Sequence, residues 1–502
     1  MKHLYFFLFC YLSSMSLFSQ HTFEGKIIDS VSKEPIPFAT VSLNNENGVI
    51  STETGDFVLN VDQDFKPTDS IFISCLGFKE KHFSALNFSA EVIALEVNEI
   101  ELDEVIVLNK TYTVDEIIEK VQDSLNKNYD TDFVEQRMFF RTSDYTNVLD
   151  KNVKIKESSI PEINQQFTDS ILSALPNKSS YHTEILADMY VKLEEENQQL
   201  KLAIVRASEL YDKNNELSFK GVEEKLQRIM RKHVKRDSYF KIKSGIIGAK
   251  SDIDSSFFED ESLDTLVAHQ QEKEQKRKEN FLKYRTGYLQ NVLRKNFVYE
   301  DSDLNFIHKD RKYDFNLDDV VYVNRNLVYK ISFQPSGGAD FKGVMYVNAD
   351  DFAVIRLDYE NVKPLKKVNL FGISYLDYLL KGTFLYEKNA RGKYSLKYVE
   401  ETSAEKIGFD RPLSIIEKNK NVKGRRKQNE VATHVDFTLE NVIKNELVVF
   451  NTENLSEETF ENFTPEPNII PTYLPNYDAS FWEGYNILPP NEAIKKFKSL
   501  DE

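Results

Sequence analysis

The chain has little cysteine and lacks long apolar runs, and these scarcities exclude several kinds of protein. Two cysteines, Cys10 and Cys75, occur in 502 residues. Cys10 lies in an apolar run at the N-terminus that we expect to be removed, so Cys75 is left alone, and we expect neither an internal disulfide nor a cysteine metal site. After that first run, no stretch approaches the roughly 18 to 20 apolar residues of a membrane helix. We therefore expect no transmembrane helix in the mature chain.

Positive charge is also scarce. Lys and Arg number 64 against 81 Asp and Glu, which gives a net charge of -17. Binding to nucleic acid needs a basic stripe that neutralises phosphates, so we expect no nucleic-acid partner. Hydrophobic residues make up 41% of the chain and charged residues 29%. This balance is typical of a globular protein, and the length indicates two to four domains.

The first twenty residues differ in kind from the rest. Met1-Lys2-His3 is a short basic start, residues 4–18 are dominated by Leu, Phe and Tyr, and Ser19-Gln20 follows. This pattern predicts a secretory signal peptide over 1–20, with a cleavage site uncertain by a residue or two. Cys10 lies in the middle of the apolar run, which disfavours a lipoprotein. We expect an exported protein that is periplasmic or associated with the cell outer membrane.

From residue 21 to 108 the sequence predicts an all-β sandwich. Short apolar segments are separated by turn residues, and the strands are expected at 24–29, 40–43, 57–61 and 70–76, with a turn at 44–48. In 57–61 the apolar residues alternate with period two, as a half-buried strand requires. Cys75 ends an apolar segment, so we expect it to be a small buried residue rather than a reactive thiol.

Four motifs in this region resemble one known domain family. They are Gly25-x-x-x-Asp29, Pro35-Ile36-Pro37-Phe38-Ala39-x-Val41, Thr52-x-x-Gly55-x-Phe57 and Ile73-x-x-x-Gly77-Phe78. In this order they resemble the carboxypeptidase-regulatory-like domain, a prealbumin-like sandwich of seven strands that is common at the front of envelope proteins of Bacteroidetes type. The resemblance implies no catalytic residues. Residues 101–107 also look like the segment that precedes the plug of TonB-dependent receptors, but no plug follows here.

The next region, 109–300, is expected to mix helices and strands. The apolar spacing predicts an amphipathic helix at 112–129, a strand at 135–142, a hairpin over 189–210, a helix at 221–235, a surface loop at 252–264 and a long charged helix at 269–294.

Residues 301–460 are predicted to form an antiparallel sheet. Strand patterns occur at 320–323, 327–333, 343–348 and 353–359, and 382–402 adds another hairpin. The segment 341–348, followed by Phe352-Ala353-Val354-Ile355, resembles strands of outer-membrane lipoprotein-sorting proteins of the LolA type, whose half-barrel implies a lipid ligand. An ordinary β-meander explains the same pattern, and both interpretations stay open.

Two later segments complete the prediction. Residues 412–429 are basic and are interpreted as a solvated loop between strands. The tail, 461–502, contains the single tryptophan, Trp482, and we expect Phe481-Trp482 to hold this tail against the body.

The sequence contains no convincing catalytic or metal motif. His269-Gln270-Gln271-Glu272 has the H-x-x-E form of zinc peptidases, but neither His308 nor His434 lies in a matching motif. Asp252-x-Asp254-x-Ser256 begins like a calcium loop and then departs from it at Phe257 and Leu263. We therefore expect no catalytic residues, no cofactor-binding residues, no metal site and no enzymatic activity.

Taken together, these patterns predict a mainly β protein with an N-terminal sandwich followed by an α+β region with a large antiparallel sheet. The LolA-type resemblance implies that this sheet is a half-barrel. The leading hypothesis is a non-catalytic envelope protein that binds lipid or an outer-membrane protein through a curved sheet. A structural or assembly module without a ligand cavity and a hydrolase of unidentified type are the alternatives. Six residues are candidates for the apolar side of the sheet, although plain core would explain them as well: Ile331, Phe333, Val344, Tyr346, Ile355 and Leu357.

Overall fold

The computed structural model describes residues 21–499, except 45, 62–65, 90, 99–111, 131, 193–198, 246, 253–262, 324–325, 390 and 425. The expected signal peptide at 1–20 and the segment 101–107 lie outside the described residues. In the part of the chain that is described, no helix combines the length and the apolarity needed to cross a membrane.

The N-terminal module is the expected sandwich, with seven strands in two sheets. One sheet has the order β4-β1-β7 and the other β3-β2-β5-β6. Apolar residues from both sheets, among them Ile27, Val41 and Ile71, are buried between them. The strands are β1 (His21–Asp29), β2 (Thr40–Leu43), β3 (Glu46–Ile50), β4 (Asp56–Val61), β5 (Ser70–Ser74), β6 (Lys81–Ser84) and β7 (Val92–Leu95). Since β3 begins at Glu46, the expected turn over 44–48 is shorter than predicted.

The remaining strands described form one open, mostly antiparallel sheet of 14 strands. Its main path is β13-β14-β15-β16-β18-β19-β20-β8-β9-β10-β21, while β11, β12 and β17 lie off this path. It therefore combines strands from 109–300 with strands from 301–460. The bounds are β8 (Phe133–Ser158), β9 (Lys178–Lys192), β10 (Gln199–Tyr211), β11 (Ser238–Ser244), β12 (Ile247–Asp252), β13 (Tyr313–Val323), β14 (Asn326–Pro335), β15 (Phe341–Asn348), β16 (Val354–Asn361), β17 (Lys366–Leu370), β18 (Ile373–Lys388), β19 (Tyr394–Asn419), β20 (Lys427–Asn454) and β21 (Thr472–Tyr473).

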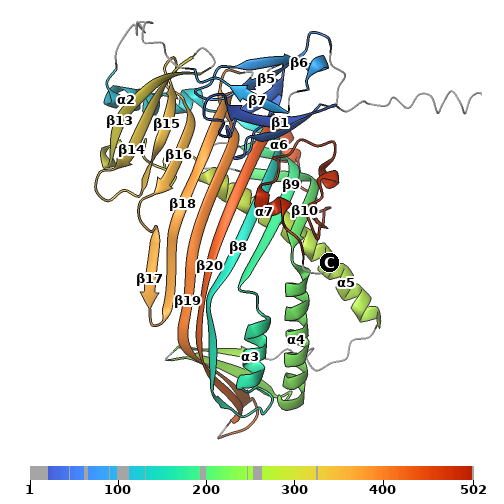
Figure 1. Cartoon of the computed structure of the whole chain (residues 1–502). Coiled ribbons are helices and arrows are strands. Elements are labelled where there is room, and N and C mark those ends of the chain that lie inside the picture. The colour runs from blue at the N-terminus through green and yellow to red at the C-terminus, as the bar shows by residue number, and fades with distance from the viewer. Residues whose placement is uncertain are drawn as a thin grey trace, which may run out of the picture.

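Three strands of this sheet are much longer than the sequence predicted. β8 and β19 have 26 residues each and β20 has 28, and they lie side by side along the length of the molecule (Figure 1). The helices are α2 (Val114–Asn128), α3 (Gln165–Ala174), α4 (Lys213–His233), α5 (Leu263–Arg294), α6 (Glu457–Asn462) and α7 (Glu492–Lys495). Helix α2 begins as its sequence dictates, because Thr113 and Glu116 form a capping box.

The long strands run from the upper to the lower end of the molecule in Figure 1. We call the part of the sheet beside the N-terminal module the upper half and the part beside α3 and α4 the lower half. We call the face that packs against α2 and α5 the inner face, and the opposite one the outer face. In the upper half the inner face is filled, because Ile118 of α2 and Leu289 of α5 pack with Phe140 and Leu447 of the sheet. The upper half is therefore a packed core and not an empty half-barrel.

The outer face of the upper half carries the N-terminal module and the C-terminal tail. Phe139 and Val448 of the sheet belong to the same apolar cluster as the module's core and Trp482. Trp482 is 2% exposed and its ring packs edge-on against Phe139. The tail is thus held by its tryptophan, as expected.

The basic loop predicted over 412–429 is shorter in the structure, where it is confined to the segment between Asn419 and Lys427. Residues up to Asn419 continue β19, and Lys427 already begins β20. Pro412 discouraged a strand assignment because proline cannot donate a ladder hydrogen bond. It is tolerated because β18 pairs with β19 only as far as Phe409, whereas β11 pairs with it from Ser414. The hairpin β11–β12, which the sequence analysis did not predict, extends the sheet beside this gap.

Candidate functional site

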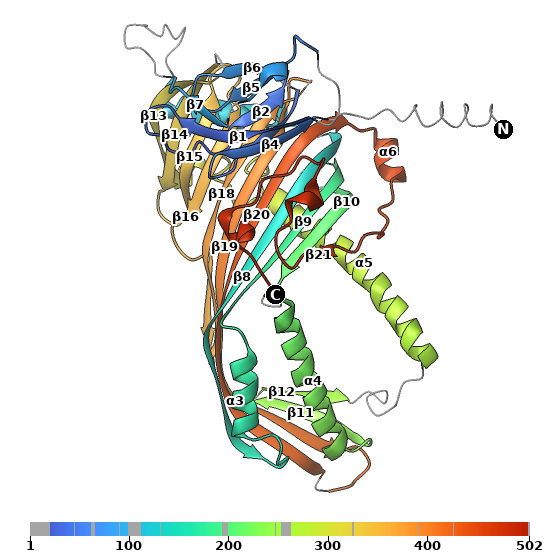
Figure 2. The same cartoon turned by 45° about the vertical axis from the view of Figure 1, so that its right-hand side comes forward.

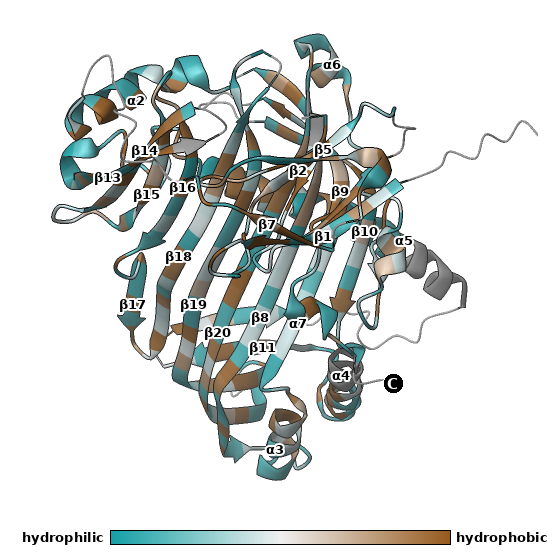
Figure 3. Cartoon of the chain, turned by 45° about the horizontal axis from the view of Figure 1, so that its top comes forward, coloured by the Kyte–Doolittle hydropathy of each residue, from teal (hydrophilic) through white to brown (hydrophobic). Residues whose placement is uncertain are grey.

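The lower half of the sheet has one apolar and one polar face. Along β19, Ile407, Phe409 and Leu413 point to the inner face, while Lys406, Asp410 and Ser414 alternate with them on the outer face. The neighbouring strands keep the same phase, because the register pairs Ile407 with Leu439 and Leu439 with Val148. Figure 3 shows this alternation as stripes along the strands. A sheet with one apolar face normally buries that face.

We call the inner apolar surface of this half the lower inner face. The residues that form it remain partly exposed, and three of them are more than a third exposed: Ile373 (41%), Ile407 (43%) and Ile415 (40%). Its other members are half-buried and belong to β18, β19, β20 and β8: Tyr375, Phe409, Leu413, Leu439, Phe437, Val435, Val431, Val148, Val153 and Ile155. The face therefore presents a mainly apolar surface of several strands that is only partly covered. Arg411, Thr433 and Lys151 occupy the polar positions within it.

Helices and a hairpin border this face. Helix α3 packs beside β8, where the Gln165 side chain accepts from the Ile155 N–H and donates to the Val153 carbonyl. These two hydrogen bonds satisfy backbone groups of β8 in the segment that no longer pairs with β9. Helix α4 contacts α3 through Ile229 and Phe167. On the other side, the Arg411 guanidinium binds the hydroxyl and carbonyl of Ser244, which fixes the β11–β12 hairpin. Figure 2 shows α3, α4 and this hairpin around the lower strands.

A row of polar side chains separates the lower inner face from the packed core above it. We call it the polar belt, and it consists of Thr142, Asp144, Thr146, Asp377, Glu401, Ser403, Glu405, Asn441 and Asn445. Asp377 and Glu405 lie directly opposite each other in the register of β18 and β19. The Tyr375 hydroxyl donates to Glu405 over 2.8 Å. Like charges in direct cross-strand positions are destabilising, so this pairing needs a reason.

Burial raises the pKa of two belt carboxyls. For Asp377 the larger cause is desolvation, and the charge of Glu405 adds to it while Lys295 opposes it. For Asp144 desolvation is again the largest cause, with a further contribution from Glu405. Lys295 itself pairs with Glu401 at 2.7 Å. The belt thus contains three further carboxylates, and the charge of Glu405 adds to the cost of ionising both Asp144 and Asp377.

Two belt side chains leave a polar atom without a partner among the described residues. Thr142 Oγ1 and Asn445 Oδ1 are buried and make no hydrogen bond there. Both residues are 5% exposed, and both lie on the inner face in adjacent positions of β8 and β20. A buried polar atom without a partner costs about 1 to 3 kcal/mol. Both atoms lie at the level of Glu401, which pairs with Lys295, and four residues along the strands from the level of Asp377 and Glu405.

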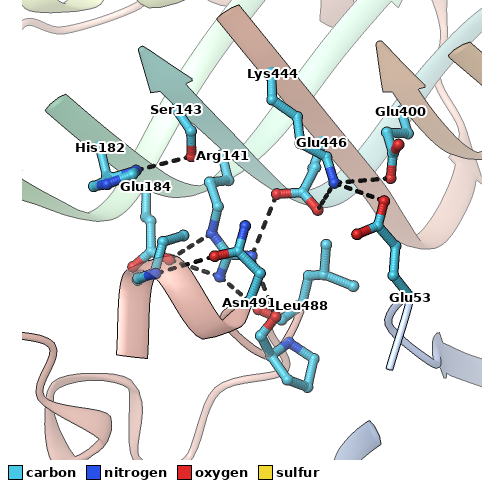
Figure 4. Close-up of polar contacts among 12 residues, drawn as sticks. Glu53, Arg141, Ser143, His182, Glu184, Glu400, Lys444, Glu446, Leu488 and Asn491 are labelled. Carbon is cyan, nitrogen blue, oxygen red and sulfur yellow. Dashed lines mark hydrogen bonds and ion pairs between the residues drawn. The ribbon is translucent and has the colours of Figure 1, made fainter. Parts of the chain in front are cut away.

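The outer face of the upper half holds a second polar cluster (Figure 4). Arg141 and Glu184 form a buried ion pair, and Trp482 Nε1 donates to Glu184 over 2.9 Å. The same guanidinium donates to the carbonyls of Leu488 and Pro489 in the tail. Nearly all its donors are engaged, so this cluster attaches the tail to the sheet and does not resemble a ligand site.

Lys444 continues this outer cluster toward the N-terminal module. It lies within 3.0–3.5 Å of carboxylate oxygens of Glu53, Glu400 and Glu446. Burial opposes protonation of Lys444, but these three carboxylates raise its pKa above the usual value. Because Glu53 belongs to the module, the contact links the two parts of the chain.

The structure contains a crevice between the module and the tail with a volume of about 1050 Å³. Its walls come from β1, β4 and residues 477–495. The Asn486 amide accepts from the Asn60 N–H and donates to the Asn60 carbonyl, which ties the tail to the module. The two walls of the crevice are thus joined by the chain itself, and we place the candidate site on the lower inner face.

The six apolar residues predicted to line the sheet do not form one surface. Ile331, Phe333 and Leu357 are buried in the core between the sheet and its helices, and Ile355 packs against that core. Val344 and Tyr346 point to the opposite face, since Phe341, Met345 and Val347 alternate with them into the core. The open apolar surface lies instead in the long strands, where 412–429 had been interpreted as a loop.

The residues considered for metal binding are placed separately. His308 contacts the carbonyls of Phe297 and Val298, whereas His434 pairs with Asp410 on the outer face of the sheet. The side chains of 269–271 lie outside the described residues, and Glu272 pairs with Lys276. Asp252 pairs with Lys250, and the rest of the calcium-like segment is not described. Within the described chain no group of three His, Cys, Asp or Glu side chains has the geometry of a metal site.

Cys75 behaves as the sequence predicted. It is 8% exposed, and burial raises the pKa of its thiol to about 11. A thiol with such a pKa stays protonated at neutral pH and is a poor nucleophile.

Comparison with known proteins identifies the N-terminal module. Residues 23–107 match the family model of the CarboxypepD_reg-like domain, which confirms the resemblance found in the four motifs. No curated protein matches the chain.

Solved structures with partial similarity have TM-scores far below those of a shared fold. A putative outer membrane lipoprotein-sorting protein domain from Vibrio parahaemolyticus is 10% identical, with a TM-score of 0.21, and covers 68% of this chain and 95% of its own. A LolA superfamily protein from Nitrosomonas europaea is 10% identical, with a TM-score of 0.18 and coverages of 70% and 98%. The MucA/MucB complex of Pseudomonas aeruginosa is 5% identical, with a TM-score of 0.15 and coverages of 67% and 99%.

Proposed function

We propose that this chain is a non-catalytic, exported envelope protein that binds an apolar ligand of the lipid class on its lower inner face. The observation that carries the proposal is the pairing of a polar outer face with a partly exposed apolar inner face over the same strands. Extended apolar surfaces on a folded protein mark binding sites, because leaving them in water is costly. Export to the periplasm or the outer membrane is part of the proposal and is supported by the signal-peptide pattern of residues 1–20.

The dimensions of the face favour an acyl chain over a compact ligand. From Ile407 to Ile415 the inward positions of β19, apolar except for Arg411, extend over about 26 Å, at roughly 3.3 Å per residue. One leaflet of a bilayer core is about 15 Å deep, so a fully extended lipid chain fits within this length. Side chains of three neighbouring strands contribute at each level of the face, which gives the width for more than one chain.

Two alternatives make different predictions. A purely structural module predicts that packed side chains cover the inner face of the sheet. The inner face is covered in the upper half, whereas in the lower half it is partly exposed. A hydrolase predicts clustered carboxylates, and Asp377 and Glu405 in the polar belt meet that condition in part. Turnover of an ester or glycoside that is abolished by Glu405→Gln would favour the hydrolase over the binding protein.

The test replaces the apolar surface without disturbing the core. In the double variant Ile407→Gln/Ile415→Gln, both changed side chains are already about 40% exposed. The control is Leu376→Gln, which changes an apolar residue on the outer face of the adjacent strand. We expect the double variant to bind a fluorescent apolar probe at least about tenfold more weakly, from the loss of two apolar contacts of about 1 kcal/mol each. The control should bind as the parent does.

The same samples are analysed by mass spectrometry for co-purified lipid. Lipid in the parent and in Leu376→Gln, but not in the double variant, would support the proposal. A folded parent protein that carries no lipid and does not bind the probe would contradict it.

A further inference from the structure

The lower end of the molecule is basic, although the protein as a whole is acidic. Residues 221–252 and 411–430 contain 16 Lys and Arg residues against six Asp and Glu residues, whereas the whole chain has 64 against 81. These segments include the end of α4, the β11–β12 hairpin and the segment that joins β19 to β20, all at the end of the molecule opposite the N-terminal module (Figure 2). We call this surface the basic end and define it by six exposed residues: Lys235, Lys243, Lys250, Lys420, Lys423 and Arg426.

Backbone contacts hold these segments together as one surface. The Lys420 N–H donates to the Asp237 carbonyl over 2.9 Å or less, at 2.8 Å, and the Lys235 N–H donates to the Glu417 carboxylate over 2.9 Å. Strand β11 pairs with β19 along its whole length, from Ser238 to Lys243. The charges from the two parts of the sequence are therefore neighbours in the fold.

Lysines face each other across the strands of this end. Lys241 lies opposite Lys250 in the β11–β12 hairpin, and Lys418 lies opposite Lys427 where β19 and β20 end. Lys250 and Lys427 each pair with a carboxylate, whereas Lys241 and Lys418 form no ion pair within the described chain. Like charges in direct cross-strand positions are destabilising. The carbonyls that end α4 favour the basic residues of its last turn, but they do not account for the lysines of the strands. An external surface with negative charge relieves this repulsion.

Exposed apolar side chains lie among these lysines. Val422, between Lys420 and Lys423 in the segment that joins β19 to β20, is 45% exposed, and Ile247 at the start of β12 is 57% exposed. A soluble polyanion is bound by charge alone and gives no reason for apolar residues here. Binding to a membrane interface combines attraction to anionic lipids with burial of apolar side chains between the headgroups. The composition of the basic end therefore favours a lipid bilayer as the partner.

The lower inner face extends down to the basic end. Ile242, Ile415 and Val431 lie in register and form its last apolar level. Strand β19 ends four residues after Ile415, at Asn419, and β20 begins four residues before Val431, at Lys427. The apolar surface and the lysines are thus adjacent on the same strands.

We propose that the basic end docks on the surface of a bilayer that contains anionic lipids. The lysines lie among the headgroups, and Val422 and Ile247 lie at the boundary with the acyl chains. The N-terminal module then points away from the membrane, and the lower inner face opens beside the bilayer surface. The proposal rests on the proposed function for its choice of a lipid surface, and it names the partner from which the lipid ligand is taken.

The experiment measures flotation of the full protein with two kinds of vesicle, one of phosphatidylcholine alone and one in which phosphatidylglycerol replaces a third of it. We expect binding to the second kind only, and weaker binding as added salt shortens the range of the charges. The variant Lys235→Gln/Lys243→Gln/Lys423→Gln should bind at least about tenfold more weakly, which corresponds to about 1.4 kcal/mol. These three lysines are exposed and form no ion pair within the described chain, and the urea unfolding midpoint checks that the variant is folded. Ile247→Gln/Val422→Gln should weaken binding about threefold or more, through the loss of apolar burial.

A matched control separates docking by the basic end from general charge attraction. Lys33, Lys66 and Lys79 are exposed in the N-terminal module, and Lys33→Gln/Lys66→Gln/Lys79→Gln changes the net charge by the same amount. This control should bind vesicles as the parent does. An equal loss in the control, or equal binding to both kinds of vesicle, would overturn the proposal. Binding to polyglutamate without binding to vesicles would also overturn it and would indicate an acidic protein as the partner.

The outcome is separate from that of the proposed function. The variant Ile407→Gln/Ile415→Gln, which should lose the apolar probe, should still float with the anionic vesicles. A parent protein that binds the probe but not these vesicles overturns the docking proposal alone. A parent protein that binds these vesicles but neither the probe nor lipid removes the proposed function and leaves the docking surface.

Discussion

Arg141 and Glu184 form an ion pair across β8 and β9 in which neither side chain is exposed to solvent, with 2.7 Å between Nη2 and Oε1. The pair also binds the tail, because Glu184 accepts from the Trp482 indole and Arg141 donates to two tail carbonyls. Docking of the tail therefore depends on a buried charge pair as well as on apolar contact.

Replacement of Arg141 by Met should destabilise the protein strongly. It leaves Glu184 buried without its counter-charge, which costs about 3 to 5 kcal/mol. Urea unfolding measures the loss, and emission of the single tryptophan, Trp482, should shift to the red as the tail is released. The control Arg137→Met breaks a pair whose arginine side chain is 43% exposed and should cost less than about 1 kcal/mol. Similar losses in both variants would contradict the role of the buried pair.

His182 should make stability depend on pH. Burial, and to a smaller extent Arg141, lowers the pKa of its imidazole from 6.5 to about 4. In the unfolded chain the imidazole protonates below about 6.5, whereas in the folded protein it stays neutral down to about 4. The unfolded state therefore binds more protons in this window, and stability falls as the pH drops from 6.5 to 4.

The size of this effect is up to about 3 kcal/mol. Unfolding of the parent and of His182→Gln is measured in urea at pH 7 and at pH 4.5, and the variant should lose less stability between the two. An identical loss would show that other groups cause the pH dependence.

Two glycines should respond oppositely to alanine. A Cβ at Gly343 would lie 2.1 Å from the Asp358 carbonyl oxygen and 2.6 Å from the Phe333 ring, so Gly343→Ala should cost about 1 to 3 kcal/mol. A Cβ at Gly221, in α4, meets nothing within 4 Å. Gly221→Ala should stabilise the protein by up to about 1 kcal/mol, through helix propensity. A neutral Gly343→Ala would show that β15 and β16 can separate to admit a methyl group.

Phe371 occupies a left-handed turn position that suits asparagine better. Its φ is +51°, and its side chain is 71% exposed in the turn between β17 and β18. Because little apolar burial is lost and the strain is relieved, Phe371→Asn should raise the unfolding free energy by about 1 kcal/mol. Chemical denaturation measures the change. Lower stability would mean that the ring makes contacts that outweigh the strain.

The sequence was sufficient for the elements with a clear local period. The strand at 57–61 and the helix at 112–129 have regular apolar spacing, and both are found within one or two residues of their predicted ends. The motifs around Gly25, Gly55 and Gly77 led correctly to the domain family because turn glycines and apolar partners recur at fixed distances in it. Gly55 shows why, since a Cβ there would lie 2.3 Å from the Ile27 carbonyl oxygen.

The candidate site could not be predicted in the same way. Residues 406–410 and 413–415 alternate between polar and apolar as a strand should, but Pro412 and the following lysines led to a loop assignment. The polar belt depends on register between strands far apart in the chain, such as Thr142 with Asn445, and no local pattern encodes that pairing. Only the fold brings Asp377 level with Glu405 and places Asp144 one inward position further along the strands.

The uninterrupted length of β8, β19 and β20 has a mechanical consequence. The upper ends of the strands that form the lower inner face are packed in the apolar core. A shift of one residue in the register of a strand would move each of its inward side chains to the outer face. The register of the sheet under the proposed binding surface is therefore fixed during folding and does not adapt to each ligand. Any accommodation must come from α3, α4 and the β11–β12 hairpin at its margins, and differences in guest size should change the positions of these elements before they change the sheet.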